Sequence, residues 1–260
     1  MSQREGQALI TALDGVAPSA ATACAGWSAH HIVAHLAAGS KEIADLIEEK
    51  LAGRPPRPTR AFEDREPAFR ALPEEELRAA WLGQIQRKTE AQNALAEVGG
   101  DSTFDFTGTA LTVAQIVTHS RSEAAVHRWD ITGTDDVSDE LLAQPELTRH
   151  AVTVLNSMSV LNESAATRIA HGHRLPLRIV LRAPGQPDVV LAANDGRNAR
   201  FELVCEGTAD GDAVVRIDAA HRLLILWGRR PSKRPVTIQA DEAVSDTVSR
   251  VLWPNAISWR

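Results

Sequence analysis

The chain changes its hydrophobic periodicity once, near residue 171, and this change restricts the folds that it can adopt. Before that point, apolar residues recur at the three- and four-residue spacing of amphipathic helices. After it, short strand-like runs are separated by Pro-Gly, Asn-Asp-Gly and Asp-Gly-Asp turn signals. The pattern predicts an α+β protein of two domains: a helical domain over residues 1–170 and a small, mostly antiparallel α+β domain over residues 175–260.

The first domain is predicted to contain four main helices. Helical spacing covers residues 4–14, 28–51, 74–98 and 112–130. Ser28 is a suitable N-cap for the second helix, and three glutamates in the first turn of the third favour the helix dipole. The connections are of medium length, including a loop from Arg54 to Pro73, so we expect an antiparallel four-helix bundle. Residues 131–145 are interpreted as a polar connector, and residues 146–170 as a further helix.

The second domain is predicted to combine short strands with two helices. Strands are expected at residues 177–181, 189–191, 201–204, 213–217 and 236–238, and helices at residues 219–227 and 241–252.

The composition excludes several classes of protein. In 260 residues, 43% are hydrophobic, which supports a folded core, and a net charge of −6 argues against nucleic-acid binding. The sequence contains no run of about 18 apolar residues, so no membrane span is expected. The first residues lack the pattern of a signal peptide. We therefore expect a cytoplasmic protein. The two cysteines, Cys24 and Cys205, are interpreted as reduced and structural.

Three residues on two helices have the chemistry of a metal site. Glu123 and His127 are four apart, so they share one face of a helix. His35 lies on another apolar helix that can pack against this face. One carboxylate and two imidazoles are three ligands for a divalent metal such as zinc, and they leave a coordination position open, as in a catalytic site.

Each of these residues also has a simpler interpretation. A glutamate and a histidine four apart occur by chance on solvated helix faces, and a single histidine on an apolar helix is usually a hydrogen-bonded core residue. His31 lies one turn before His35 and could at best support a ligand without binding the metal itself. His119, two turns before His127, either extends the same face or is a polar residue facing the bundle.

A resemblance favours the metal interpretation. Gly26-Trp27 precedes a helix that carries Val33-Ala34-His35-Leu36, and residues 123–130 read Glu-Ala-Ala-Val-His-Arg-Trp-Asp. Residues 223–229 read Leu-Leu-Ile-Leu-Trp-Gly-Arg. In this order the three segments resemble the mycothiol-dependent maleylpyruvate isomerase family, whose N-terminal domain is a DinB-like four-helix bundle and whose C-terminal domain is a small α+β domain. The chain departs from the family in having His30-His31 where members often have Arg-Asp.

The resemblance implies a site and a chemistry. The family's ligand set falls on His35, Glu123 and His127, and its Trp-Gly-Arg position falls on Arg229, which is implied to bind a carboxylate of substrate or cofactor; a structural salt bridge is its alternative role. The implied cofactor is a divalent metal, zinc above all, and the implied cosubstrate is mycothiol. A metal lowers the pKa of a bound thiol below its ordinary value of about 8.5. The resulting thiolate is then expected to attack a small-molecule electrophile.

Three functions follow from this reasoning. The first is a mycothiol-dependent enzyme that performs either S-transfer or cis–trans isomerisation, with thiol transfer slightly favoured because nothing in the sequence identifies a dicarboxylate site. The second is a metal-binding stress-response or regulatory protein without turnover. The third is a metal-dependent hydrolase with water at the open position. No nucleic-acid or membrane partner is expected, and the oligomeric state is left open.

Overall fold

A computed structural model of the chain describes residues 3–99, 102–157, 175–229 and 234–252, and their contacts divide them into two units between Gly133 and Thr134. The mixed helix-and-sheet, two-domain architecture predicted from the sequence is confirmed. The division falls earlier than the predicted one near residue 170, because the helices that follow Gly133 pack with the second unit. These are α7 (Asp136–Leu142), which contacts α10 (Ala219–Leu226), and α8 (Pro145–Ser157), which contacts the strand β5 (Ala199–Val204).

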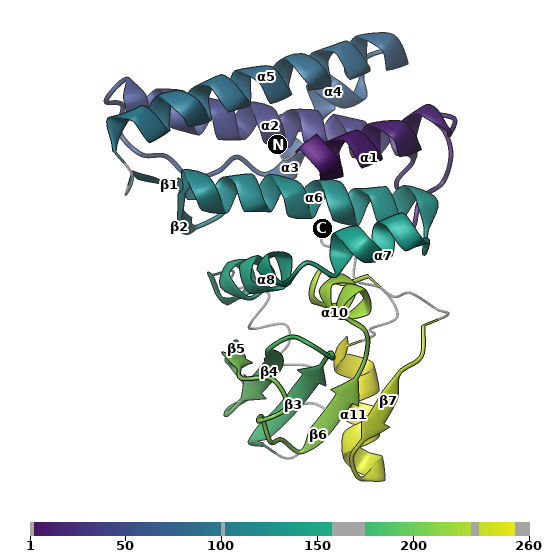
Figure 1. Cartoon of the computed structure of the whole chain (residues 1–260). Coiled ribbons are helices and arrows are strands. Elements are labelled where there is room, and N and C mark those ends of the chain that lie inside the picture. Colours follow the sequence, from purple (N-terminus) through teal and green to yellow (C-terminus); the bar gives the residue numbers. More distant parts are fainter. Residues whose placement is uncertain (1–2, 100–101, 158–174, 230–233, 253–260) are drawn as a thin grey trace. The chain divides into compact units, whose positions relative to one another are not determined.

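The first unit is built mainly from long helices near the predicted positions (Figure 1). They are α1 (Gln3–Asp14), α2 (Ala29–Leu51), α5 (Glu74–Val98) and α6 (Val113–Thr132). α2 packs along α5, and α1 packs along α6. Two apolar clusters fill the spaces between them, one around Trp81 and one around Phe104 and Phe106.

Local capping sets the starts of the two helices that carry the predicted ligands. Ser28, as predicted, caps α2: its Oγ accepts a hydrogen bond from the His31 backbone N at 3.4 Å, and His31 Nδ1 accepts one from the Ser28 backbone N at 3.0 Å. Thr112 and Gln115 form the same reciprocal pair at the start of α6. Both helix starts are therefore fixed by their own sequence.

Three features of the first unit and its border were not predicted. The expected loop from Arg54 to Pro73 contains two one-turn helices, α3 (Phe62–Arg65) and α4 (Pro67–Arg70). An antiparallel hairpin, β1 (Thr103–Phe106) and β2 (Thr109–Thr112), precedes α6. Its two-residue turn places both Thr107 and Gly108 at positive φ, 54° and 81°, as a type I′ turn requires. The stretch interpreted as a polar connector, residues 131–145, includes the end of α6 and all of α7.

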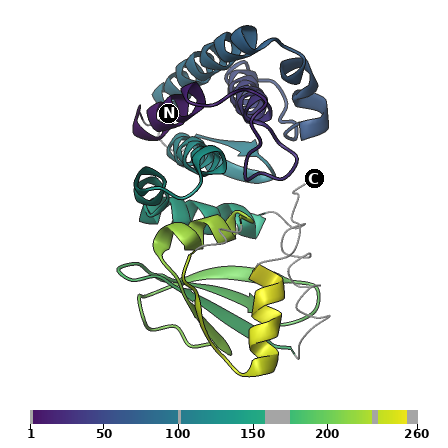
Figure 2. The same ribbon diagram turned by 90° about the vertical axis from the view of Figure 1, so that its right-hand side faces the viewer.

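The second unit is a five-stranded mixed sheet with helices packed against it, as predicted in outline. Its remaining elements are β3 (Leu177–Arg182), β4 (Asp188–Ala193), β6 (Ala213–Arg216), β7 (Thr237–Gln239) and α11 (Glu242–Leu252). The strand order is β5-β4-β3-β6-β7; β3 and β6 are parallel and the other pairs are antiparallel. α11 lies against β6 (Figure 2). The part of the predicted helix 146–170 beyond Ser157 lies outside the described residues. None of the helices in the described ranges is both long and apolar enough to cross a membrane.

A buried ion pair joins β3 to the start of β4, and its removal is expected to destabilise the second unit. The side chain of Asp188 is fully buried and accepts hydrogen bonds from Arg182 and from the Ala209 backbone N at 3.2 Å. For Asp188→Asn we expect the free energy of unfolding of this unit to fall by about 2 kcal/mol, because Arg182 loses hydrogen bonds to a charged partner. Urea denaturation at pH 7 measures this loss, and the exposed Asp246→Asn, with a change within about 0.5 kcal/mol, is the control.

The same pair gives a pH dependence of known sign. Burial raises the pKa of the Asp188 carboxyl, but the hydrogen bonds from Arg182 and Ala209 outweigh burial and hold the pKa below its ordinary value. The ionised carboxylate therefore stabilises the fold above the ordinary pKa of about 4 and loses this effect as the pH falls through the lowered pKa. The wild type and Asp188→Asn should accordingly converge in stability in acid; a difference that persists undiminished would contradict this assignment.

Candidate metal centre

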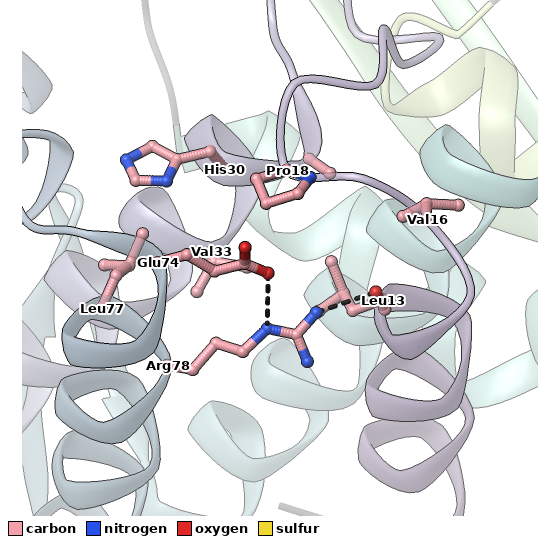
Figure 3. Close-up of a pocket in the computed structure, with 9 residues that line it drawn as sticks. Leu13, Val16, Pro18, His30, Val33, Glu74, Leu77 and Arg78 are labelled. Carbon is pink, nitrogen blue, oxygen red and sulfur yellow. Dashed lines mark hydrogen bonds and ion pairs between the residues drawn. The ribbon is translucent and has the colours of Figure 1, made fainter.

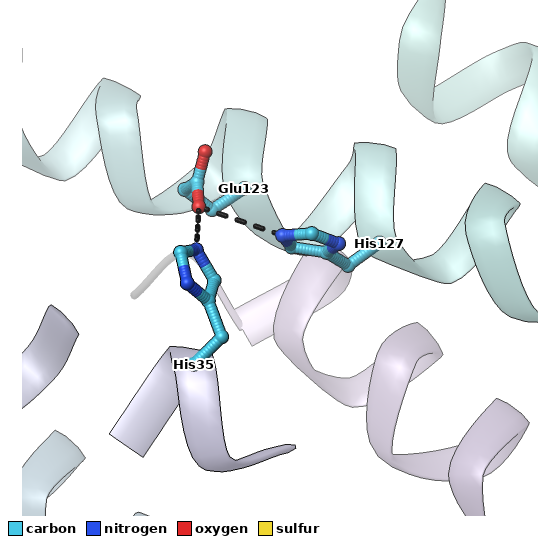
Figure 4. Close-up of side chains that lie close together, drawn as sticks. All are labelled: His35, Glu123 and His127. Carbon is cyan, nitrogen blue, oxygen red and sulfur yellow. Dashed lines mark hydrogen bonds and ion pairs between the residues drawn. The ribbon is translucent and has the colours of Figure 1, made fainter. Parts of the chain in front are cut away.

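The three predicted ligands lie together inside the first unit (Figure 4). His35 comes from α2, and Glu123 and His127 lie one turn apart on α6. Glu123 Oε2 is 3.2 Å from His35 Nε2 and 3.6 Å from His127 Nε2. One ligand atom from each of the three residues lies within 4.8 Å of the others. The packing of α2 near α6 thus brings one carboxylate and two imidazoles to a common point.

Two further carboxylates hold the ligand histidines from behind. Glu66 Oε1 lies 2.7 Å from His35 Nδ1, and Asp130 Oδ2 lies 2.9 Å from His127 Nδ1. These contacts place the proton on Nδ1 of each ring and turn Nε2 toward Glu123. Histidines that bind metals almost always donate their other ring N–H to a carboxylate or carbonyl in this way. The donor set therefore fits a divalent metal, and zinc in particular.

Ion pairs hold the segment between α2 and Glu66 in place. Glu42, which is fully buried, accepts hydrogen bonds from Arg57 Nη1 at 2.6 Å and from Arg60 Nε at 2.6 Å. These contacts fix the segment after α2 against the helix that carries His35. Glu66 follows this segment at the junction of α3 and α4, where it also accepts hydrogen bonds from Arg70.

The electrostatics of the cluster favour a carboxylate beside a cation. Burial raises the pKa of Glu123, but hydrogen bonds from His127 and His35 outweigh burial and hold it well below its ordinary value. Burial lowers the pKa of His127, yet the hydrogen bonds with Asp130 and Glu123 raise it to about 9. In the metal-free protein His127 is thus protonated at neutral pH, and the proton occupies the place that a cation would take.

Aromatic rings shield the two histidines. The Trp27 ring lies 5.1 Å from the ring of His35 and stacks at 12° on the ring of His127, 6.2 Å away. Phe62, from α3, lies 5.3 Å from His35. Trp27 therefore contacts the site, in addition to the packing role that the sequence indicated. The contacts limit the access of water to the ligand rings.

The two other histidines considered from the sequence take different places. His31 belongs to the cap of α2, where its Nδ1 is held by Ser28. His119 lies with its ring 5.2 Å from Phe106 and lines a pocket beside the cluster. Burial lowers the pKa of His119, so it is neutral at pH 7.

The pocket beside the cluster has a volume of about 50 Å³. His35 and Glu123 form part of its wall, together with two basic side chains, Arg65 and Lys88. From the sequence, neither of these two residues was assigned a place in the site, and neither was Glu66 or Asp130. Asp130 alone had a local signal, because it lies three residues after His127 on the same helix and so shares its face. The other three come from distant segments that only the fold brings near.

A second pocket lies where the end of α1 meets the starts of α2 and α5, and it has the features of ordinary packing (Figure 3). Its charged residues satisfy one another: Arg78 Nε is 3.5 Å from Glu74 Oε1, and Arg78 Nη2 donates to the Leu13 carbonyl at 2.8 Å. With a volume of about 10 Å³ it has room for about one water molecule.

Arg229, the fourth residue named from the sequence, belongs to the second unit. It follows α10, where Gly228 and Arg229 donate backbone hydrogen bonds to the last turn of the helix, and its Nη1 donates to the Trp227 carbonyl at 2.9 Å. The cluster of His35, Glu123 and His127 is complete within the first unit without it. A role for Arg229 in binding a carboxylate stays a prediction.

These observations define a class of protein: a helical unit with a partly buried His-Glu-His cluster, followed by a small α+β unit. Models of known protein families match the two parts of the chain separately. The model for the mycothiol maleylpyruvate isomerase N-terminal domain matches residues 2–132, and the model for the MDMPI C-terminal domain matches residues 146–247. The chain therefore belongs to the mycothiol-dependent maleylpyruvate isomerase family, and the resemblance found in the sequence is confirmed. This membership also supports the prediction that the chain is an enzyme.

Solved structures show the same fold. A mycothiol-dependent maleylpyruvate isomerase and a histidine-to-alanine mutant of it each align with a TM-score of 0.58 and 16% sequence identity. Each alignment covers 90% of this chain and 88% of the other chain. At this identity the likeness extends to the fold alone. No curated protein sequence matches the chain.

Proposed function

We propose that the protein is a metal-dependent, mycothiol-using isomerase, in which His35, Glu123 and His127 bind one divalent metal ion. The observation that carries the proposal is the pair of carboxylates behind the two histidines, because an incidental cluster of polar residues has no need of them. A metal bound there would lower the pKa of a thiol at the open position and stabilise the thiolate at neutral pH. We also infer that α1, α2, α5 and α6 form a four-helix bundle of the DinB type.

Several residues of the chain would have separate roles in such a reaction. His35, Glu123 and His127 supply one negative charge, so a divalent site retains positive charge that favours an anionic ligand. Glu66 and Asp130 fix the tautomers of the two rings, and Trp27 and Phe62 reduce hydration near them. Addition of a thiolate to a double-bonded carbon, rotation about the resulting single bond and elimination of the thiolate give cis–trans isomerisation without net change of atoms. If another group leaves, the same addition gives S-transfer.

We propose that Arg229 contributes a carboxylate-binding guanidinium to this enzyme, as the family resemblance implies. Its position at the end of α10, where its main chain is held by the helix, supports a fixed placement. Arg229→Lys keeps the charge and loses the bidentate geometry. It is therefore expected to raise KM for an anionic substrate without changing metal content.

The proposal is tested by elemental analysis combined with calorimetric titration of mycothiol, before and after chelation. We expect about one zinc ion per chain and thiol binding that chelation abolishes and added zinc restores. Metal without thiol binding would overturn the thiol-dependent mechanism and favour a hydrolase or a binding protein. Absence of metal from protein purified without chelator and then incubated with zinc would overturn the proposal as a whole.

A further inference from the structure

The pocket beside the candidate metal centre contains two buried cations that form no ion pair with a carboxylate in the described part of the chain. Lys88, on α5, is only 3% exposed, and its Nζ donates one hydrogen bond, to Ser120 Oγ at 2.9 Å. Among the described residues, no carboxylate lies within ion-pair distance of Lys88. Burial lowers the pKa of the Lys88 ammonium to about 8, and the charge of Glu123 partly opposes this. A buried ammonium with one neutral partner is unfavourable for stability, so its presence points to a role in function.

Arg65 presents a similar case at the same pocket. It lies at the end of α3 with 9% of its surface exposed, and its guanidinium lies over the Phe62 ring at 4.5 Å. Its Nε and Nη1 are buried and have no hydrogen-bond partner within the described part of the chain. Burial lowers the pKa of Arg65, although three surrounding carboxylates act in the opposite direction. These unused N–H groups are the kind of donors that arginine presents to a carboxylate.

The nearby carboxylates are already engaged. Glu123 contacts both ligand histidines, and Glu66 is held by His35 and Arg70. Of the charged groups that line the pocket, Arg65 and Lys88 are cationic and Glu123 is anionic, so the pocket has an excess of positive charge. This excess is largest when a metal ion takes up the negative charge of Glu123. The electrostatic field therefore favours an anion next to the position where a thiol would bind.

We propose that Arg65 and Lys88 form a subsite for a carboxylate of the electrophilic substrate. This inference rests on the proposed function for the identity of the reaction, and adds to it two residues that would bind the substrate beside the metal. The size of the pocket agrees: one water molecule needs roughly 10–15 Å³ of such space, so about 50 Å³ accommodates a group as small as a carboxylate. Arg65 donates from its N–H groups that have no partner in the described residues, and Lys88 adds a positive charge to the lining of the pocket.

The test is calorimetric titration of maleate into the protein without thiol, in metal-loaded and chelated forms. Binding to the chelated form separates the subsite from direct ligation of maleate to the metal. We expect binding of maleate, and at least tenfold weaker binding by Lys88→Met and by Arg65→Met. Lys50→Met, which removes an exposed lysine from the end of α2, should bind maleate as the wild type does. Maleamide, which lacks the negative charges, should bind the wild type at least tenfold more weakly than maleate.

Stability and ligand preference together distinguish a carboxylate subsite from a purely structural role of the buried cations. If Lys88 had only a structural role, Lys88→Met would lower the melting temperature and leave the maleate-to-maleamide preference unchanged; we expect an equal or higher melting temperature and loss of the preference. Lys88→Gln serves as a second variant if the methionine variant does not fold. Inorganic phosphate that binds as tightly as maleate would overturn the assignment to carboxylates.

The same variants distinguish this inference from the proposed function. Metal content and mycothiol binding should be unchanged in Lys88→Met. If the protein binds metal and thiol but neither Lys88→Met nor Arg65→Met changes the affinity for maleate, the subsite is rejected and the proposed function stands. If instead maleate binding depends on Arg65 and Lys88 but the protein binds neither metal nor thiol, the subsite stands and the proposed function is rejected.

Discussion

Replacing His35 by alanine is expected to give a folded protein that has lost its metal ion and its thiol-dependent activity. Structural zinc with four ligands binds with about 10–16 kcal/mol, so one ligand contributes roughly 3–4 kcal/mol, or 10²- to 10³-fold in affinity. Without metal, a thiol of pKa about 8.5 is only a few per cent ionised at pH 7. We therefore expect metal content well below one ion per chain after dialysis, and turnover reduced at least 10²-fold.

His35 is a better position for this test than His127. When His35 is removed, Glu66 keeps its hydrogen bonds from Arg70. Removal of His127 deprives the fully buried carboxylate of Asp130 of its hydrogen bond with the ring, which adds a cost in stability unrelated to metal binding. His30→Ala, on the first turn of the same helix, is the matched control and should keep metal and activity. Unchanged metal content in His35→Ala would remove His35 from the ligand set.

The ligand set was accessible from the sequence because most of it depends on local geometry. Glu123 and His127 share a face of any α-helix, and α6 runs unbroken from Val113 to Thr132 and is capped as its residues dictate. The contribution of His35 required knowledge of which face of α2 packs toward α6, and the family resemblance supplied it. The order of helices and strands followed from periodicity, since most of the described elements bury one face and expose the other.

The surroundings of the ligands were not accessible in the same way. Glu66 and Arg65 lie in a segment with several arginines and prolines. The path of this segment depends on the ion pairs of Arg57 and Arg60 with Glu42, which is far from them in the sequence. Lys88 lies on a helix whose other basic residues, Arg78 and Arg87, are half-buried and paired with carboxylates, and only the packing of α5 shows that Lys88 is buried. The hairpin before α6 has a short turn, Thr107-Gly108, which is less distinctive than Asn-Gly or Asp-Gly.

The hydrogen bond between Asp130 and His127 is expected to control the pH dependence of metal binding. The pKa of His127 in the metal-free protein is about 9. Below this value a metal ion must displace the Nε2 proton, so affinity should rise about tenfold per pH unit between pH 7 and 8.5. In Asp130→Asn the pKa of His127 falls, because an amide stabilises the imidazolium less than a carboxylate does. The rise of affinity with pH should therefore be flatter in the variant.

The Asp130 carboxylate stabilises both cations that compete for His127 Nε2, the proton and the divalent metal ion. The difference in their charges decides how Asp130 changes the metal affinity. A divalent ion carries more charge than a proton, so Asp130 stabilises the metal-bound ring more than the protonated one. We expect Asp130→Asn to bind zinc 10- to 100-fold more weakly at pH 8.5, and with a smaller loss at pH 7, where the wild type competes with its own proton. Zinc titration against a competing chelator at both pH values measures this, with the exposed Asp14→Asn as the control. Equal affinities for the variant and the wild type at pH 8.5 would show that Asp130 supports the helix and not the metal.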